Sequence, residues 1–236
     1  MSPSQPKRRS VLASVALGEL AATLRSGIYP LIPLAELPEP IPAPGRDQPV
    51  LLVHGYMAHR EVLRPLARHL LNAGFSRVHR VGYPSMALPF EGVVAAIADA
   101  ARPLAARHGK VHLVGHSLGA LASRAWIKLF GGHHIVDRFV SLGGPHGGTA
   151  LHRVVPSPVR PAFDPDGPWI RRINEGPEPV PTFVIRARYD HQVFPPERAQ
   201  IRGTDEIVVE AHGHNGLLWS PQAHAAVAHA LTRPIG

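Results

Sequence analysis

The sequence predicts one α/β domain, built on about six mostly parallel strands with helices on both faces of the sheet. The length of 236 residues allows one large domain with a substantial core. From Pro49 onward, short apolar runs alternate with helical patterns of about ten to fifteen residues, which is typical of a parallel sheet covered on both faces. Apolar residues make up 44% of the chain and charged residues 18%, so the composition excludes wholesale disorder.

The N-terminal residues are expected to precede the sheet. Four apolar residues recur with helical spacing: Leu17, Leu20, Ala21 and Leu24. This stripe predicts an amphipathic helix that packs on the core. Residues 28–49 then contain seven prolines, which neither a helix nor a central strand tolerates. We therefore expect a helix and a proline-rich lead-in over residues 1–47, and the main domain over residues 48–236.

A second interpretation of the N-terminus is an export signal. Arg8-Arg9-Ser10-Val11-Leu12 resembles a twin-arginine signal, which would occupy residues 1–26. However, the apolar run that begins at Val11 ends at Leu17, and no convincing cleavage site follows. We expect a cytoplasmic protein, with export as the alternative. Since no run of about 18 apolar residues occurs, we expect no transmembrane segment.

The expected elements follow from short β-branched or aliphatic runs and from helical patterns that end at glycine. Strands are expected at residues 50–53, 77–83, 111–115, 135–142, 181–187 and 206–211. Helices are expected at residues 61–73, 90–107, 118–130 and 221–231, with a kink at Pro103. Residues 150–180 are rich in proline and have no clear period. A loop this long inside a compact domain is usually functional, here as a small lid or rim.

Composition also narrows the classes of function. The net charge is +8, but the basic residues are scattered and aromatic residues are only 6%, so we expect no nucleic-acid binding. Weak attraction to anionic lipid surfaces is consistent with this charge. The chain has no cysteine, which excludes a disulfide, a thiol nucleophile and a Cys-ligated metal. No H-E-x-x-H or similar metal-ligand spacing occurs, so we expect no metal and no cofactor.

The strongest motif is Gly115-His116-Ser117-Leu118-Gly119, a G-x-S-x-G pattern between a predicted strand and a predicted helix. This setting is typical of a nucleophile elbow, in which a serine occupies a strained turn. Neighbouring backbone comes close to such a turn, and only glycine leaves room two residues before and two residues after the serine. The pattern predicts that Ser117 is a nucleophile.

A serine nucleophile needs a base, and the base needs an orienting acid. In this architecture the acid and then the histidine follow the serine, each on a loop after a strand. Asp190 and His214 occupy these positions. His212, two residues earlier, is an alternative base. Three other acids remain open as orienting groups: Asp164, Asp166 and Asp205.

Acyl transfer also needs donors for the oxyanion, usually two backbone N–H groups. The N–H of Leu118, directly after the nucleophile, is the first candidate. His54-Gly55-Tyr56 follows the first strong strand, so we expect the N–H of Tyr56 to be the second. Six apolar or amphipathic residues next to these loops are candidates for the acyl pocket: Tyr56, Met57, His146, Trp169, Ile170 and Leu217.

Taken together, these segments resemble the bacterial lipase and esterase branch of the α/β-hydrolase superfamily over residues 48–232. The resemblance also involves Gly144-Pro145-His146-Gly147-Gly148-Thr149 and Gly213-His214-Asn215-Gly216-Leu217-Leu218. The second of these runs looks like the catalytic-histidine signature of small, minimally lidded bacterial triacylglycerol lipases, which favours His214 over His212. The resemblance implies the α/β-hydrolase fold and hydrolysis of carboxylic esters, often lipids, with no cofactor. Residues 150–180 are too short for the large helical cap of bigger lipases.

The expected mechanism is acyl transfer through an acyl-enzyme, with Ser117, His214 and Asp190 as the triad. Attack on a carbonyl is common to several reactions, so an acyltransferase, a thioesterase or a polyester hydrolase remains an alternative. A further alternative is a binding module with a hydrolase-like fold and no catalysis, because a fold does not fix a function. The sequence leaves these alternatives open.

Overall fold

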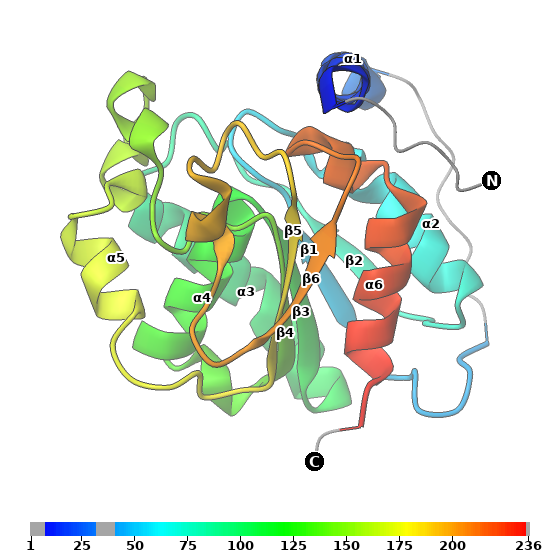
Figure 1. Cartoon of the computed structure of the whole chain (residues 1–236). Helices are drawn as coiled ribbons and strands as arrows, with labels where there is room; N and C mark the ends of the chain where they lie inside the picture. Colours follow the sequence, from blue (N-terminus) through cyan, green and yellow to red (C-terminus); the bar gives the residue numbers. More distant parts are fainter. Residues whose placement is uncertain (1–7, 32–40, 235–236) are drawn as a thin grey trace.

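The sheet has six strands, all parallel, in the order β2-β1-β3-β4-β5-β6. The computed structural model describes residues 8–31 and 41–234 (Figure 1). The strands are β1 (Val50–Val53), β2 (Val78–Val81), β3 (Val111–His116), β4 (Val136–Leu142), β5 (Thr182–Ala187) and β6 (Asp205–Val209). The predicted fold class is confirmed, and each predicted strand end agrees to within two residues.

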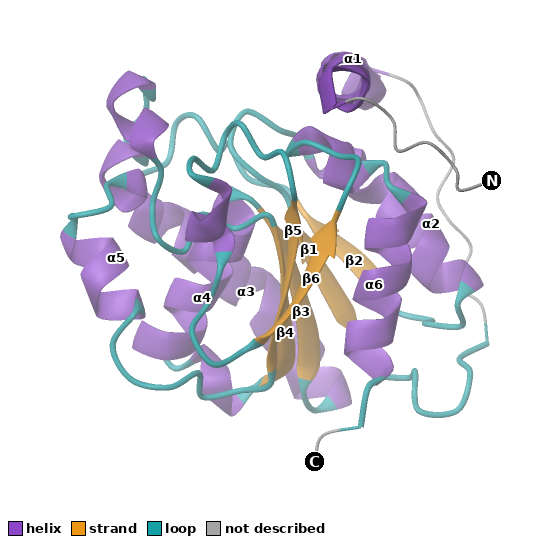
Figure 2. Ribbon diagram, in the orientation of Figure 1, coloured by secondary structure: helices purple, strands orange, loops and turns teal. Residues whose placement is uncertain are grey.

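Helices cover both faces of the sheet (Figure 2). One face packs against α3 (Phe90–His108) and α4 (Leu118–Leu129), and the other against α2 (Arg64–Asn72) and α6 (Pro221–Thr232). Strand β1 serves both cores, because its side chains alternate: Leu51 and Val53 contact the first core, and Val50 and Leu52 the second. Burial on both faces explains why the strands are continuous apolar runs.

The predicted helices are present with small changes at their ends. Helix α2 follows a 3-10 turn, Arg60–Leu63, with proline at its first turn. Helix α3 continues through Pro103 to His108. Residues 150–180, predicted as a loop without a period, contain two 3-10 turns, Ala150–Val154 and Arg160–Phe163, and the short helix α5 (Pro168–Ile173).

Helix α1 (Arg8–Ile28) forms as predicted, but the predicted buried face is wrong. Leu17, Leu20 and Leu24 are 69%, 57% and 58% exposed. The buried residues of the helix are instead Val15, Glu19 and Ala22. The helix contacts the 3-10 turn Asn215–Leu218 beyond the carboxyl ends of the strands, as Figure 1 shows. The helix docks partly through the carboxylate of Glu19, a contact that leaves no apolar pattern in the sequence.

Helix α1 also contains an 18-residue window, Val11–Ile28, that is long and apolar enough to cross a membrane. Only 17% of this window is buried. A signal sequence near an N-terminus has the same length and composition, so these two properties do not by themselves identify a membrane span. The absence of a transmembrane segment therefore stays a prediction.

Candidate active site

Ser117 occupies a strained turn between β3 and α4. Its backbone has φ 54° and ψ −122°, a region that a residue with a side chain adopts only at a cost of about 1–3 kcal/mol. Among the described residues, Ser117 and Met57 are the two non-glycine residues with positive φ. Both residues border the same pocket. The backbone strain of the described structure is therefore concentrated at the predicted nucleophile.

The two glycines of the motif lie where backbone segments come very close together. A Cβ atom on Gly115 would lie 2.5 Å from the Cα of Ala120, and one on Gly119 would lie 2.6 Å from the carbonyl oxygen of Val53. Such distances are incompatible with a side chain at either position. The prediction that only glycine fits on both sides of Ser117 is confirmed. The contact at Gly119 holds the start of α4 against the end of β1.

His214 and Asp190 are hydrogen-bonded neighbours, although 24 residues separate them in the chain. The Nδ1–H of His214 donates to Oδ2 of Asp190 over 2.7 Å. The other oxygen, Oδ1, accepts the backbone N–H groups of Gln192 at 2.9 Å and Val193 at 2.8 Å. Asp190 is thus fixed by its own loop, and the imidazole can present only Nε2 to a substrate.

Charge stabilises this pair in its ionised form. Burial alone would raise the pKa of Asp190, but His214 and the two backbone donors hold this pKa below its ordinary value. Burial alone would lower the pKa of His214, but the Asp190 carboxylate and, to a smaller extent, Glu19 raise it above 6.5. The pair therefore suits a base that becomes a stabilised imidazolium.

One pocket of about 270 Å³ is bordered by both Ser117 and His214. Tyr56 and Met57 line it, as predicted. The other lining residues come mainly from the segment after β4 and from the Asp190 loop: Pro145, Thr149, Leu151, Val154, Val155, Pro156, Phe163, Gln192 and Val193. The sequence did not predict these wall residues, because they lie in 3-10 turns and loops that have no apolar period.

The other four predicted pocket residues lie outside this lining. His146 is fully buried and shares a 2.7 Å hydrogen bond with the hydroxyl of Ser141. Trp169 packs edge-on against Phe90, with ring centroids 4.9 Å apart. The remaining two, Ile170 and Leu217, belong to the two hydrophobic cores. All four side chains pack into or against the buried interior and not in the wall of the pocket.

The predicted oxyanion donors lie on adjacent backbone. A Cβ atom on Gly55 would lie 2.9 Å from Cβ of Ser117, so the turn that carries Tyr56 packs directly on the nucleophile. Within residues 8–31 and 41–234, the N–H groups of Tyr56 and Leu118 donate to no protein acceptor. Their role as oxyanion donors stays a prediction.

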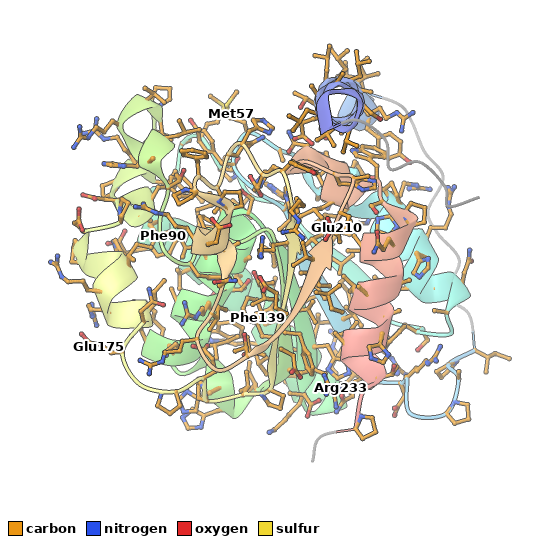
Figure 3. The ribbon with its side chains drawn as sticks, in the orientation of Figure 1. Met57, Phe90, Phe139, Glu175, Glu210 and Arg233 are labelled. Atoms are coloured by element: carbon orange, nitrogen blue, oxygen red, sulfur yellow. The ribbon has the colours of Figure 1, made fainter. Side chains whose placement is uncertain are left out.

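In the described structure, Nε2 of His214 is buried and has no hydrogen-bond partner, so the bond to the Ser117 hydroxyl is not formed. Such contacts are often long in the absence of a substrate and shorten when a substrate binds. The shared pocket still places both groups at one end of the sheet. Figure 3 shows Met57, another residue of this pocket, at the same end of the molecule as α1.

The alternative acids and base lie elsewhere. His212 borders a separate hollow beside α1 that also includes Glu19, not the pocket of Ser117. Asp205 pairs with Arg233, and Asp164 lies 3.8 Å from His152. Asp166 is exposed. Within the part of the chain that the structure describes, no group of three or more His, Cys, Asp or Glu residues could hold a metal ion.

Two larger hollows, of about 590 and 920 Å³, lie away from this site. They share five bordering residues at the other end of the sheet: Pro177, Glu178, Arg202, Gly203 and Thr204. Neither is bordered by Ser117, Asp190 or His214. The smaller pocket at Ser117 is therefore the candidate active site.

The structure is similar to those of several lipases. The mature lipase BlEst2 of Bacillus licheniformis matches with a TM-score of 0.70 and 15% identity, over 82% of this chain and 96% of that chain. Aspergillus fumigatus lipase B matches with a TM-score of 0.67 and 20% identity, over 82% and 56%. The monoacylglycerol lipase of Paleococcus ferrophilus matches with a TM-score of 0.60 and 18% identity, over 79% and 96%. The similarity confirms the α/β-hydrolase fold.

No curated protein sequence matches the chain. The sequence profile of the palmitoyl protein thioesterase family matches residues 49–173, which run from β1 through the nucleophile motif to the end of α5. Together with the lipase structures, this match confirms the resemblance to the lipase and esterase branch. Since the profile covers just over half of the 236 residues, the chain belongs to the palmitoyl protein thioesterase family of the α/β-hydrolase superfamily.

Proposed function

We propose that this protein is a serine hydrolase that cleaves carboxylic esters with Ser117 as nucleophile, His214 as base and Asp190 as orienting acid. One observation carries the proposal: Ser117 and His214, 97 residues apart, border one pocket, and His214 is hydrogen-bonded to the buried Asp190. Nucleophile, base and orienting acid are the groups that acyl transfer needs. A binding module would not need a strained serine beside a paired imidazole.

The reaction proceeds in two steps. The hydroxyl oxygen of Ser117 attacks the ester carbonyl while its proton passes to Nε2 of His214. The negative charge that develops on the carbonyl oxygen is stabilised by the N–H groups of Tyr56 and Leu118. The C–O bond to the alcohol then breaks, and the alcohol leaves with the proton held by His214. Water then attacks the acyl carbonyl while its proton passes to the same imidazole. The bond between the acyl group and the Ser117 oxygen breaks, the carboxylic acid leaves, and the imidazolium returns the proton to Ser117.

Asp190 acts through His214. Its carboxylate accepts the Nδ1–H, so Nε2 keeps the free electron pair that takes the proton of Ser117. The same carboxylate stabilises the imidazolium that forms in the transition state. Because the carboxylate also accepts two backbone N–H groups, it does not rotate away when the imidazole charges.

A fluorophosphonate probe tests the proposal directly. We expect the wild-type protein to be labelled at Ser117, to hydrolyse p-nitrophenyl esters, and to lose both properties on Ser117→Ala. The matched control is Ser157→Ala, at a residue that does not border the pocket. If the wild-type protein is not labelled, the alternative of a non-catalytic binding module is favoured. Substantial turnover by Ser117→Ala would show that another residue is the nucleophile.

Thioester hydrolysis is the second candidate, and the family match favours it. The attack on the carbonyl is the same, and a thiolate leaves more readily than an alkoxide, so the site needs no additional group. Matched oxygen and sulfur esters of the same acyl chain distinguish the candidates through their kcat/KM ratio. A ratio that favours the thioester beyond their difference in uncatalysed hydrolysis would support a thioesterase. If the thioester is favoured no more than it is in uncatalysed hydrolysis, the result would support a carboxylesterase.

We also propose weak attraction to anionic lipid surfaces. The net charge of +8 and the exposed Leu20 and Leu24 of α1 support it. Co-sedimentation with phosphatidylserine vesicles should weaken as salt is added. Equal binding to neutral phosphatidylcholine vesicles would contradict an electrostatic contribution.

A further inference from the structure

Glu19 connects helix α1 to the loop that carries His214. Its Oε1 accepts the backbone N–H of Asn215 at 2.6 Å, and its Oε2 accepts that of Gly216 at 2.9 Å. One turn further along the helix, the hydroxyl of Thr23 accepts the side-chain amide of Asn215 at 3.0 Å. The first two donors follow His214 directly in the chain.

This contact is short and leaves little freedom. The side chain of Glu19 is only 9% exposed, although carboxylates are rarely buried without a partner. A Cβ atom on Gly213 would lie 2.6 Å from Oε2, so the loop passes as close to the carboxylate as a residue without a side chain allows. Residues 213, 215 and 216 thus all meet one carboxylate, and His214 lies between them.

No Lys or Arg forms an ion pair with Glu19 in the part of the chain that the structure describes. The imidazole of His191 lies 3.9 Å from Oε1, on a side chain that is 56% exposed. The backbone N–H groups therefore provide most of the compensation for burying this charge. Charge-assisted bonds of this kind are about twice as strong as neutral ones.

The opposite side of the loop is held by the sheet. The carbonyl oxygen of His214 lies 3.4 Å from Nε2 of His116, and the rings of these two residues pack with centroids 4.9 Å apart. Leu217 is fully buried in the core. Without α1, the loop would keep these contacts but would lose both acceptors on its outer side.

We propose that Glu19 is a positioning residue, which fixes the 213–216 loop so that the imidazole of His214 meets both Asp190 and the substrate at Ser117. The role rests on the proposed function of the triad. It gives the N-terminal helix a part in catalysis that its sequence pattern, an apolar stripe, does not indicate. Glu19 itself touches no substrate, since it does not border the pocket of Ser117.

The charge of Glu19 also affects the pKa of His214, and this effect can be measured in the pH dependence of the rate. The charged or titratable groups that face His214 are Asp190, His116 and Glu19. Burial lowers the pKa of His214, whereas Asp190 and, less strongly, Glu19 raise it. Removing the charge of Glu19 should therefore shift the acidic limb of the rate profile to lower pH. A helix that only stabilises the fold would not move this limb.

The test compares Glu19→Gln with two control variants. A glutamine amide can accept one of the two N–H groups, but its NH₂ group opposes the other. We expect kcat to fall by about 10- to 100-fold with KM nearly unchanged, because a small misplacement of a catalytic group has effects of this size. The controls are Leu17→Ala, at an exposed position of the same helix, and Glu175→Gln, which removes the same charge at an exposed position (Figure 3). Both should retain wild-type kcat.

A second measurement does not depend on turnover. Hydrogen exchange should show the amides of Asn215 and Gly216 protected in the wild type and exchanging faster in Glu19→Gln. The amides of core strands such as β3 should be unchanged in both proteins, which would show that the variant is folded. Unchanged exchange at both loop amides in a folded variant would overturn the contact itself.

Fluorophosphonate labelling separates failure of this proposal from failure of the proposed function. If the wild type is labelled at Ser117 and Glu19→Gln is labelled at the same rate with the same pH profile, Glu19 does not position His214. If the wild type is not labelled, the triad assignment fails, and the positioning role fails with it. A labelled wild type with a slower, acid-shifted Glu19→Gln variant would support both.

Discussion

The Nδ1 atom of His214 and the Oδ2 atom of Asp190 lie 2.7 Å apart, and the two side chains are 1% and 0% exposed. Asp190 follows β5 and His214 follows β6. These are neighbouring parallel strands whose carboxyl ends reach the same edge of the sheet. A charged pair that is this well buried is stabilising only if its remaining hydrogen-bonding positions are filled. Asp190 meets this condition through two backbone donors. Breaking the pair should therefore have large effects on activity.

Asp190→Asn should lower kcat for ester hydrolysis by about 10³- to 10⁴-fold. The amide can donate a hydrogen bond to Nδ1 and so stabilise the tautomer in which Nε2 carries the proton and is no longer a base. Steady-state rates with a p-nitrophenyl ester measure the loss. Asp166→Asn, at an exposed position outside the pocket, is the control and should keep wild-type kcat. A loss of less than tenfold in Asp190→Asn would show that another group orients the imidazole.

The rate of hydrolysis should fall on the acidic side of neutrality. His214 must be neutral to accept the proton of Ser117, and its pKa lies above 6.5 because of Asp190. The value of kcat/KM should therefore be half-maximal at a pH above 6.5 and fall tenfold per pH unit below that point. A profile measured from pH 5 to 9 tests this. A flat profile over this range would exclude His214 as the base.

Most of the fold could be predicted from the sequence, for a physical reason. The strands are buried on both faces, so each is a short apolar run between turns, and the glycines around Ser117 occupy positions where a side chain does not fit. The prediction of which face of α1 is buried was wrong, because the helix docks through Glu19 and leaves Leu17 and Leu20 exposed. A prediction from apolar periodicity holds only where a helix docks through its apolar side chains.

The pocket was predictable only in part. Tyr56 and Met57 follow a recognisable strand, so their position could be inferred from the motif. Leu151, Val154 and Val155 come from a 3-10 turn and the residue after it, where no repeat indicates which side faces the site. Leu217 is three residues from His214 in sequence, and His146 lies in the loop after β4, but both side chains turn into the interior. Proximity along the chain did not determine side-chain direction.

Gly119→Ala should destabilise the protein by about 1–3 kcal/mol, the usual range for an overpacked site. The new methyl group would lie 2.6 Å from the carbonyl oxygen of Val53, and backbone cannot move away as a side chain can. Urea unfolding measures the change. The matched control is Gly18→Ala on α1, where a Cβ atom meets nothing within 4 Å. Because alanine favours helix over glycine, Gly18→Ala should instead stabilise by up to about 1 kcal/mol. Equal effects of the two substitutions would contradict the close contact at Gly119.

Short and medium acyl chains should be hydrolysed fastest. The pocket of about 270 Å³ lies just below the usual range of ligand sites, which is about 300–1,000 Å³. A longer chain would extend past Leu151 and Val154, which are 42% and 75% exposed, and would gain little from burial. A panel of p-nitrophenyl esters from acetate to palmitate tests this.

Val155→Trp would narrow this pocket from within its wall. We expect it to lower kcat/KM for the butyrate and octanoate esters more than for the acetate ester, which serves as the internal control. An equal reduction for all chain lengths would indicate that the acyl group binds elsewhere. If kcat/KM of the wild type is highest for the palmitate ester, the acyl group must also bind outside this pocket.

The protein should lose stability as the pH falls from 6.5 towards 4. Burial lowers the pKa of His54 and His112 to about 4 and that of His116 to about 3. In the unfolded chain these imidazoles take up protons below pH 6.5, whereas in the folded protein they stay neutral. The stability they provide is therefore complete above pH 6.5 and decreases through the range down to about 4. At pH 5.5 each of these three histidines should lower the free energy of unfolding by about 1.4 kcal/mol relative to its value at high pH.

His112 provides the sharpest test, because it lies in β3 and does not border the pocket. The difference in unfolding free energy between pH 7.5 and pH 5.5 should be smaller in His112→Leu than in the wild type by about 1.4 kcal/mol. Using this difference cancels the opposite contribution of His214, whose raised pKa adds stability at low pH that is lost as the pH rises. His229→Leu, at an exposed position of α6, should leave the difference unchanged. If both variants behave alike, burial of a neutral His112 does not contribute to the acid sensitivity of the fold.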